Sequence, residues 1–135
     1  MKAAIRVLDA YSLIAYLENE DGADKMIEIF RGARDSGRDL LLSVVNWGEI
    51  YYITLREAGR ERVEAVARLI STLPIQVIPA DLDLTREAAE LKASKKMSYG
   101  DCFAAALAKL RKAELVTGDV DFKQLEGEIK ILWIE

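Results

Sequence analysis

Histidine is absent from the 135 residues of this sequence. Its absence excludes a serine or cysteine nucleophile activated by histidine, a histidine general base, and a zinc site built from cysteine and histidine. Any catalysis must therefore use carboxylates, hydroxyls, lysine, arginine, tyrosine, or a metal ion held by oxygen. A ligand set made only of oxygen favours Mg²⁺, Mn²⁺ or Ca²⁺.

Cysteine and long apolar runs are also scarce. The single cysteine, Cys102, cannot form an intrachain disulfide, which is consistent with the cytosol. No apolar run reaches the roughly 18 residues that a spanning helix needs, and residues 1–5 lack the apolar stretch of a signal peptide. We therefore expect a cytoplasmic protein without a membrane segment.

Basic residues are not in excess, because 23 acids face 19 bases and the net charge is -4. The overall field does not attract nucleic acid, although metal ions and a local basic patch could still bind a phosphodiester. Asparagine and glutamine are rare beside 31% charged residues, a composition more typical of thermophilic proteins. The length and the 51% hydrophobic content predict one domain, residues 1–135, with a sizeable core.

Short apolar runs alternate with helical periodicity along the chain. Strands are expected at residues 4–8, 40–43, 75–78, 115–117 and 129–134. Helices are expected at residues 10–17, 23–33, 45–57, 60–72, 82–94 and 99–113, with Gly59 ending the third. This alternation predicts an α/β fold with a mainly parallel sheet.

Acidic residues follow two of these strands and begin two of these helices. Asp9 ends the first strand, and Asp119 follows the fourth after the turn residue Gly118. Glu49 and Asp101 are expected in the first turns of the helices at 45–57 and 99–113. Ligands bind at the carboxyl ends of parallel strands where the strand order reverses, so these acids meet if the first and fourth strands are neighbours.

Four converging carboxylates repel one another. Two unit charges ~4 Å apart cost about 4 kcal/mol at an effective dielectric constant near 20. The cluster is tolerable only if some acids keep a proton or a divalent cation lies between them. Mg²⁺ and Mn²⁺ suit such ligands, and they can activate water and stabilise a leaving oxygen. Phosphodiester hydrolysis is then possible without histidine.

Each acid also has a purely structural explanation. Asp9 can cap the helix that follows it. The segments 46–49 and 98–101 both fit a capping box, and Asp119 and Asp121 can shape a turn. Taken singly, each acid is better explained in this way. Taken together, their positions at strand ends and helix starts make a metal site an equal alternative.

Four segments resemble the motifs of PIN-domain ribonucleases. They are VLDAYSLIAYL at 7–17, NWGEI at 46–50, SYGDCFAAA at 98–106 and TGDVDF at 117–122. They span essentially the whole chain in order, and its small size resembles the VapC-type toxins of that family. The resemblance implies a three-layer α/β/α fold with a five-stranded parallel sheet. It also implies Mg²⁺- or Mn²⁺-dependent endoribonuclease activity in a type II toxin–antitoxin system.

The resemblance also implies roles for single residues. Metal ligation and catalysis are carried over to the acids Asp9, Glu49, Asp101 and Asp119. Asp121 would be an auxiliary acid, and Ser12 and Thr117 match hydroxyl positions that orient an acid or a water. Ala10 departs from the family pattern, which often has threonine or serine there, so the hydroxyl role in the first motif rests on Ser12.

Partners follow from the same resemblance. It implies an RNA substrate, a homodimer, and a VapB-type antitoxin whose C-terminal segment covers the site. The aromatic residues Trp47, Tyr51 and Tyr52 exceed what one helix face can bury, so they predict either a half-exposed core rim or a partner interface.

Basic residues close to the acids in sequence are candidates for contacts with RNA phosphates. They are Arg6, Lys95 and Lys96. Taken singly, each is better explained as part of a solvated segment.

Three other functions are considered. A haloacid dehalogenase-like phosphatase needs a second aspartate at the position of Tyr11, which argues against it. A receiver domain needs paired acids after the first strand, although Asp9, Asp81 and Lys130 fit parts of its pattern. The alternative outside enzymes is a catalytically silent PIN-like module that binds RNA or protein.

Overall fold

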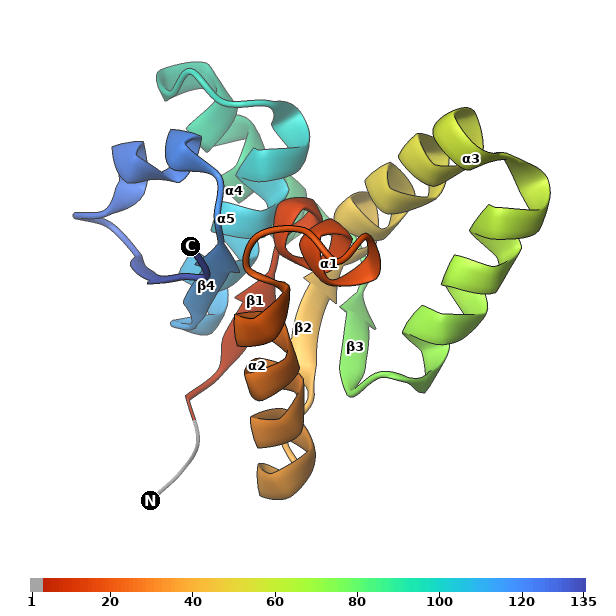
Figure 1. Cartoon of the computed structure of the whole chain (residues 1–135). Helices are drawn as coiled ribbons and strands as arrows, with labels where there is room; N and C mark the ends of the chain where they lie inside the picture. The colour runs from red at the N-terminus through yellow and green to blue at the C-terminus, as the bar shows by residue number, and fades with distance from the viewer. Residues whose placement is uncertain (1–3) are drawn as a thin grey trace.

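The computed structural model describes residues 4–135. It contains one parallel five-stranded sheet with the strand order β3-β2-β1-β4-β5 (Figure 1). The strands are β1 (Arg6–Leu8), β2 (Leu40–Ser43), β3 (Ile75–Ile78), β4 (Glu114–Thr117) and β5 (Lys130–Trp133). The helices are α1 (Ala10–Leu17), α2 (Ala23–Ser36), α3 (Val44–Thr72), α4 (Leu82–Ser94) and α5 (Tyr99–Arg111), followed by the 3₁₀ helix η1 (Val120–Leu125). The predicted α/β class and the parallel sheet are confirmed.

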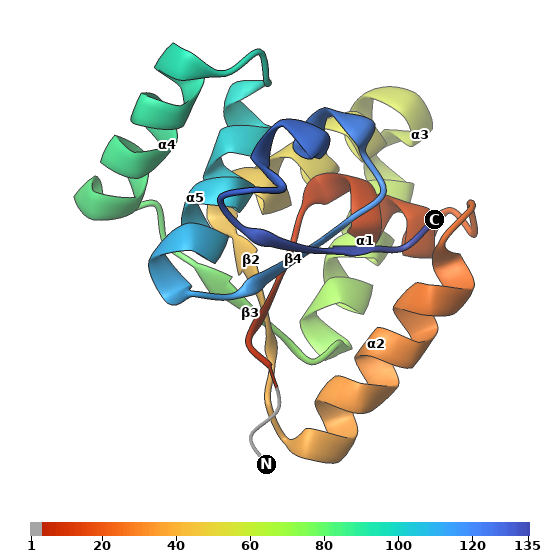
Figure 2. The same ribbon diagram turned by 90° about the vertical axis from the view of Figure 1, so that its left-hand side faces the viewer.

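Helices cover both faces of the sheet, which gives three layers (Figure 2). Along β1, Val7 packs into the core that α4 and α5 close, and Leu8 packs into the core on the side of α1, α2 and α3. In β4, Leu115 packs into the same core as Val7, and Val116 packs into the same core as Leu8. Because both faces of these strands are buried, each contains two successive apolar residues instead of an alternation of apolar and polar ones. The segment 102–108 of α5 is wholly buried, as its uniform apolar character predicts.

Several predicted boundaries are wrong by a few residues. β1 begins at Arg6 instead of residue 4, and β5 is shorter at both ends than the predicted 129–134. Helix α2 continues beyond residue 33 to Ser36, where Gly37 ends it with a φ of 69°. Helix α5 ends at Arg111, two residues early, because Lys112 adopts a left-handed conformation. In each case the apolar pattern marks the buried residues, whereas backbone geometry sets the end. Residues 1–3, part of the segment expected to lack a signal peptide, lie outside the description.

Helix α3 consists of two limbs that meet at Gly59, whose φ of 88° and ψ of 177° are not helical. The limbs correspond to the two helices predicted at 45–57 and 60–72, and they form the hairpin at the side of the molecule in Figure 1. The capping box predicted at 46–49 is wrong. Ser43 caps the helix by accepting a hydrogen bond from the Val45 amide (3.2 Å), so Glu49 lies beyond the first turn.

Within residues 4–135, no helix is both long enough and apolar enough to cross a membrane.

Candidate active site

The strand order reverses between β1 and β4. The two strands are parallel neighbours, and Leu8 pairs in register with Val116. From β1 the sheet continues through β2 to β3 on one side, and from β4 to β5 on the other. The segments that follow β1 and β4 therefore leave the carboxyl edge at one place, where parallel α/β sheets bind ligands. The expectation that the first and fourth strands are neighbours is confirmed.

Asp9 lies at this place and is completely buried. Its Oδ1 accepts a hydrogen bond from the Ser12 amide (2.8 Å), which caps α1, and its Oδ2 accepts one from the Thr117 hydroxyl. The Thr117 oxygen in turn accepts from the Asp119 amide (3.0 Å), which links Asp9 to the loop after β4. The Ser12 hydroxyl donates to the backbone carbonyl of Asp9 (3.1 Å).

Three other carboxylates converge near Asp9. One oxygen from each of Asp101, Asp119 and Asp121 lies within 4.8 Å of the others. Asp101 is in the first turn of α5, where its amide donates to the capping residue Ser98 (3.2 Å). Asp119 caps η1 and accepts from the Asp121 amide (2.9 Å). Helix η1 was not predicted from the sequence, and it places Asp121, predicted only as auxiliary, within this trio.

Glu49 approaches the trio from α3 and is partly buried. Its Oε1 accepts a hydrogen bond from Asn46 Nδ2 (2.7 Å). Its carboxyl group lies directly against Gly100, the residue before Asp101, so closely that a Cβ at Gly100 would overlap it. Glu49 therefore borders Asp101 but is not one of the three carboxylates that converge most closely.

The electrostatics of the site favour a proton or a cation. Burial raises the pKa of Asp9 to about 7, although the hydrogen bonds from Thr117 and Ser12 act in the opposite direction. Burial, and then the charge of Asp119, raise the pKa of Asp101 to about 6, and burial also raises the pKa of Glu49. None of the ion pairs formed within residues 4–135 includes an acid of this site.

The residues present fit a hard divalent cation. Carboxylate oxygens are the ligands that Mg²⁺ and Mn²⁺ prefer, and three of them come from side chains close enough to share one ion. Their mutual repulsion is not balanced by lysine or arginine, so a cation would lower the free energy of the cluster. The acids that would hold it directly are Asp101, Asp119 and Asp121, with Asp9 and Glu49 beside them.

The three basic residues predicted to contact RNA lie in different places. Arg6 begins β1 and pairs through Nε with Glu114 Oε1 (3.1 Å), at the end of the strand away from Asp9. Lys95 pairs with Glu128 (2.9 Å). The backbone amide and carbonyl of Lys96 bond to the side chain of Gln124, which also donates to the backbone carbonyl of Asp121 (3.1 Å). The loop of Lys95 and Lys96 is therefore next to η1 and the acids, whereas Arg6 is not.

Two further contacts at this edge were not predicted. The Tyr11 hydroxyl donates to the carboxylate of Glu135, and both side chains lie against Gly118, which leaves no room for a Cβ there. The bond to Glu135 raises the pKa of Tyr11 to about 12. Asn46 is a second residue that the sequence analysis does not assign to the site. It lies in the segment that resembles a PIN motif, but the pattern suggests only that it caps a helix.

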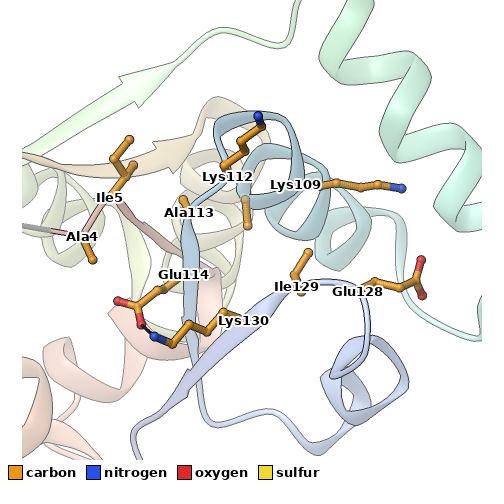
Figure 3. A pocket seen from close by; sticks show the side chains of 10 residues that line it. Ala4, Ile5, Lys109, Lys112, Ala113, Glu114, Glu128, Ile129 and Lys130 are labelled. Atoms are coloured by element: carbon orange, nitrogen blue, oxygen red, sulfur yellow. Dashed lines mark ion pairs between the residues drawn. The ribbon is translucent and has the colours of Figure 1, made fainter.

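The opposite edge of the sheet carries a hollow of about 370 Å³. Its lining includes lysines 109, 112 and 130 and two glutamates. Lys130 pairs with one of them, Glu114 (3.2 Å), and Figure 3 marks this pair. Lys130 therefore lies away from Asp9. Asp81 follows β3 and caps α4 by accepting from the Leu84 amide (2.9 Å). The arrangement considered for a receiver domain is not formed by these residues.

Two of the aromatic residues singled out in α3 are partly buried, and one is exposed. Trp47 and Tyr51 are partly buried and stack with their ring centroids 5.3 Å apart. Tyr52 is 50% exposed and lies 5.3 Å from the Arg56 guanidinium.

Comparison with known proteins gives one family. The family model of the PIN domain matches residues 6–128. No curated protein sequence matches the chain.

Solved structures share the fold at low sequence identity. A toxin–antitoxin complex from Klebsiella pneumoniae has a TM-score of 0.73 and 17% identity, over 96% of this chain and 98% of that one. DNA-bound VapBC from Salmonella typhimurium has a TM-score of 0.74 and 20% identity, over 98% and 100%. VapC20 from Mycobacterium tuberculosis, described as a toxin that cleaves the sarcin-ricin loop, has a TM-score of 0.70 and 17% identity, over 88% and 93%.

Proposed function

The chain belongs to the PIN-domain family, and we propose that it is a metal-dependent endoribonuclease that acts as the toxin of a toxin–antitoxin pair. The proposal treats residues 1–135 as one PIN domain. Its substrate is RNA, and its reaction is hydrolysis of a phosphodiester bond with Mg²⁺ or Mn²⁺.

One observation carries this proposal. Oxygens of Asp101, Asp119 and Asp121 lie within 4.8 Å of one another at the point where the strand order reverses. Acids that only capped helices or shaped turns would gain nothing from this proximity, because each would raise the free energy of the others. A site that binds a cation and a phosphate explains why the repulsion is retained.

The acids have separate tasks in this proposal. A divalent cation would activate water and stabilise the leaving oxygen. Asp101, Asp119 and Asp121 would hold that cation, and Glu49 would contribute from α3. Asp9 would support the site through Thr117, whose hydroxyl donates to the Asp9 carboxylate and accepts from the Asp119 amide. Lys95 and Lys96 would contact phosphates beside the site, whereas Arg6, at the end of β1 away from Asp9, is not proposed for this role.

Partners are proposed from the structural relatives. The Klebsiella and Salmonella proteins are described as members of toxin–antitoxin complexes. A VapB-type antitoxin is accordingly the proposed partner, and a homodimer is the proposed assembly.

The test is RNA cleavage by purified protein in Mg²⁺ or Mn²⁺. We expect wild type to cut RNA with the metal and not in EDTA, and Asp119→Asn to lose cleavage because the amide has lost a charged ligand oxygen. Asp35→Asn, on the exposed side of α2, is the matched control and should cut like wild type.

Two results would contradict the proposal. Cleavage by Asp119→Asn that persists in EDTA would exclude the metal mechanism. RNA binding without cleavage, under conditions where the metal binds, would favour the alternative of a catalytically silent PIN-like module.

A further inference from the structure

The side chain of Asn46 is buried between two helices that carry acids of the site. Its Nδ2 donates one hydrogen bond to Glu49 Oε1 (2.7 Å) within α3. The same nitrogen donates a second to the backbone carbonyl of Gly100 (2.9 Å), one residue before Asp101. Asn46 therefore connects the acid of α3 to the first turn of α5.

The contacts fix the orientation of the Asn46 amide. With the amide reversed, its oxygen would face a carboxylate oxygen and a carbonyl oxygen, and no donor would lie between them. In the orientation found, Oδ1 is buried and has no donor within residues 4–135. A buried acceptor without a partner costs about 1–3 kcal/mol, which offsets much of what the two donated hydrogen bonds contribute to stability.

Gly100 is unfavourable for stability alone. It lies within α5 and has no positive φ that would require glycine. Gly100 is the second residue of α5, and alanine is the better helix former at such a position. What glycine provides is space, because a Cβ at residue 100 would overlap the carboxyl group of Glu49.

We propose that Asn46 and Gly100 are positioning residues that hold the Glu49 carboxylate beside Asp101 for divalent-cation binding. Gly100 allows the carboxylate to approach the backbone of α5, and Asn46 holds Oε1 in that position. This inference rests on the proposed function, since it assigns the Asn46–Gly100 pair a task in the same metal site. It predicts that the pair determines cation affinity through Glu49.

The first test is titration of the metal-free full chain with MnCl₂ by calorimetry, comparing wild type with Gly100→Ala. The new Cβ displaces the flexible end of Glu49, and we expect Mn²⁺ affinity to fall about 10-fold or more, as for other residues that orient metal ligands. The thermal midpoint in EDTA should stay equal or rise, because alanine favours the helix. Gly48→Ala is the matched control, since a Cβ there meets no atom within 4 Å. It should leave Mn²⁺ affinity unchanged.

A double-mutant cycle separates positioning from general disruption. Asn46→Ala and Gly100→Ala should each lower Mn²⁺ affinity in wild type and have no further effect in a Glu49→Gln background. Equal losses in both backgrounds, or no loss in wild type, would overturn the inference while leaving the proposed function intact. If wild type itself binds no Mn²⁺, the proposed function fails and this inference fails with it.

Discussion

Asp9 has two roles that were weighed as alternatives in the sequence. Its Oδ1 caps α1 through the Ser12 amide, and its Oδ2 receives the Thr117 hydroxyl at the carboxyl edge of the sheet. The same carboxyl group can therefore end β1, begin α1 and support the loop that carries Asp119. The structural explanation was correct, and it does not exclude a place in the site.

The raised pKa of Asp9 predicts a pH dependence of stability for the metal-free protein. The pKa is about 7 in the folded chain, against 3.8 as the ordinary value, so between these pH values the folded state keeps a proton that the unfolded state has lost. The unfolding free energy therefore falls as pH rises through this range, by on the order of 3 kcal/mol between pH 5 and 8. Asp9→Asn cannot titrate and should lack this contribution.

Urea unfolding in EDTA at pH 5 and pH 8 measures the difference. The unfolding free energy of Asp9→Asn, relative to wild type, should increase from pH 5 to pH 8. Asp35→Asn, at an exposed position of α2, should follow wild type at both pH values. If Asp9→Asn and wild type lose the same stability over this range, burial of Asp9 is not the source of the pH dependence.

At the scale of elements, the hairpin of α3 depends on one glycine. Gly59 has φ 88° and ψ 177°, a conformation that is essentially restricted to glycine, and no atom of residues 4–135 would obstruct a Cβ there. Gly59→Ala should therefore destabilise the fold by about 1–3 kcal/mol through backbone strain alone. Thermal unfolding measures this, with Gly32→Ala as the control.

The control Gly32→Ala is expected to stabilise the fold instead of destabilising it. Gly32 lies inside α2, where a Cβ meets nothing and alanine favours the helix by up to about 1 kcal/mol. If Gly59→Ala instead stabilised the fold, the change of direction between the two limbs of α3 would not require the backbone conformation of Gly59.

Helix η1 is the element that sequence reasoning missed. It is six residues long, too short for a helical periodicity to be recognised. Its signal was the spacing of Phe122 and Leu125, which lie three residues apart and are both buried. Asp119 caps η1, and Asp121 lies in its first turn. Without η1, the sequence therefore predicts only an auxiliary role for Asp121.

At the scale of the whole molecule, cation binding and folding should be coupled. An ion that binds only the folded chain raises its stability by about 2.7 kcal/mol at a hundredfold excess over Kd. We expect Mg²⁺ or Mn²⁺ to raise the thermal midpoint, and to do so more at pH 8 than at pH 5.5. The sign follows from the raised pKa values of Asp9 and Asp101, about 7 and 6, since protons compete with the cation at low pH.

Potassium chloride at matched ionic strength controls for general screening in this measurement. An equal rise with potassium, or an effect of Mg²⁺ that is larger at pH 5.5, would contradict a site made of these carboxylates.

The sequence alone determined the order of the strands and α-helices, though not η1, because the apolar pattern records which residues are buried. It also placed Asp9 and Asp119 at strand ends, because a charged residue ends a buried strand. It could not determine which strands are neighbours, since residues 8 and 116 pair only once the sheet forms. Nor could it show the approach of Glu49 to Gly100, or the position of Asn46 between α3 and α5. These contacts join segments about 50 residues apart, and only the packing of those helices brings them together.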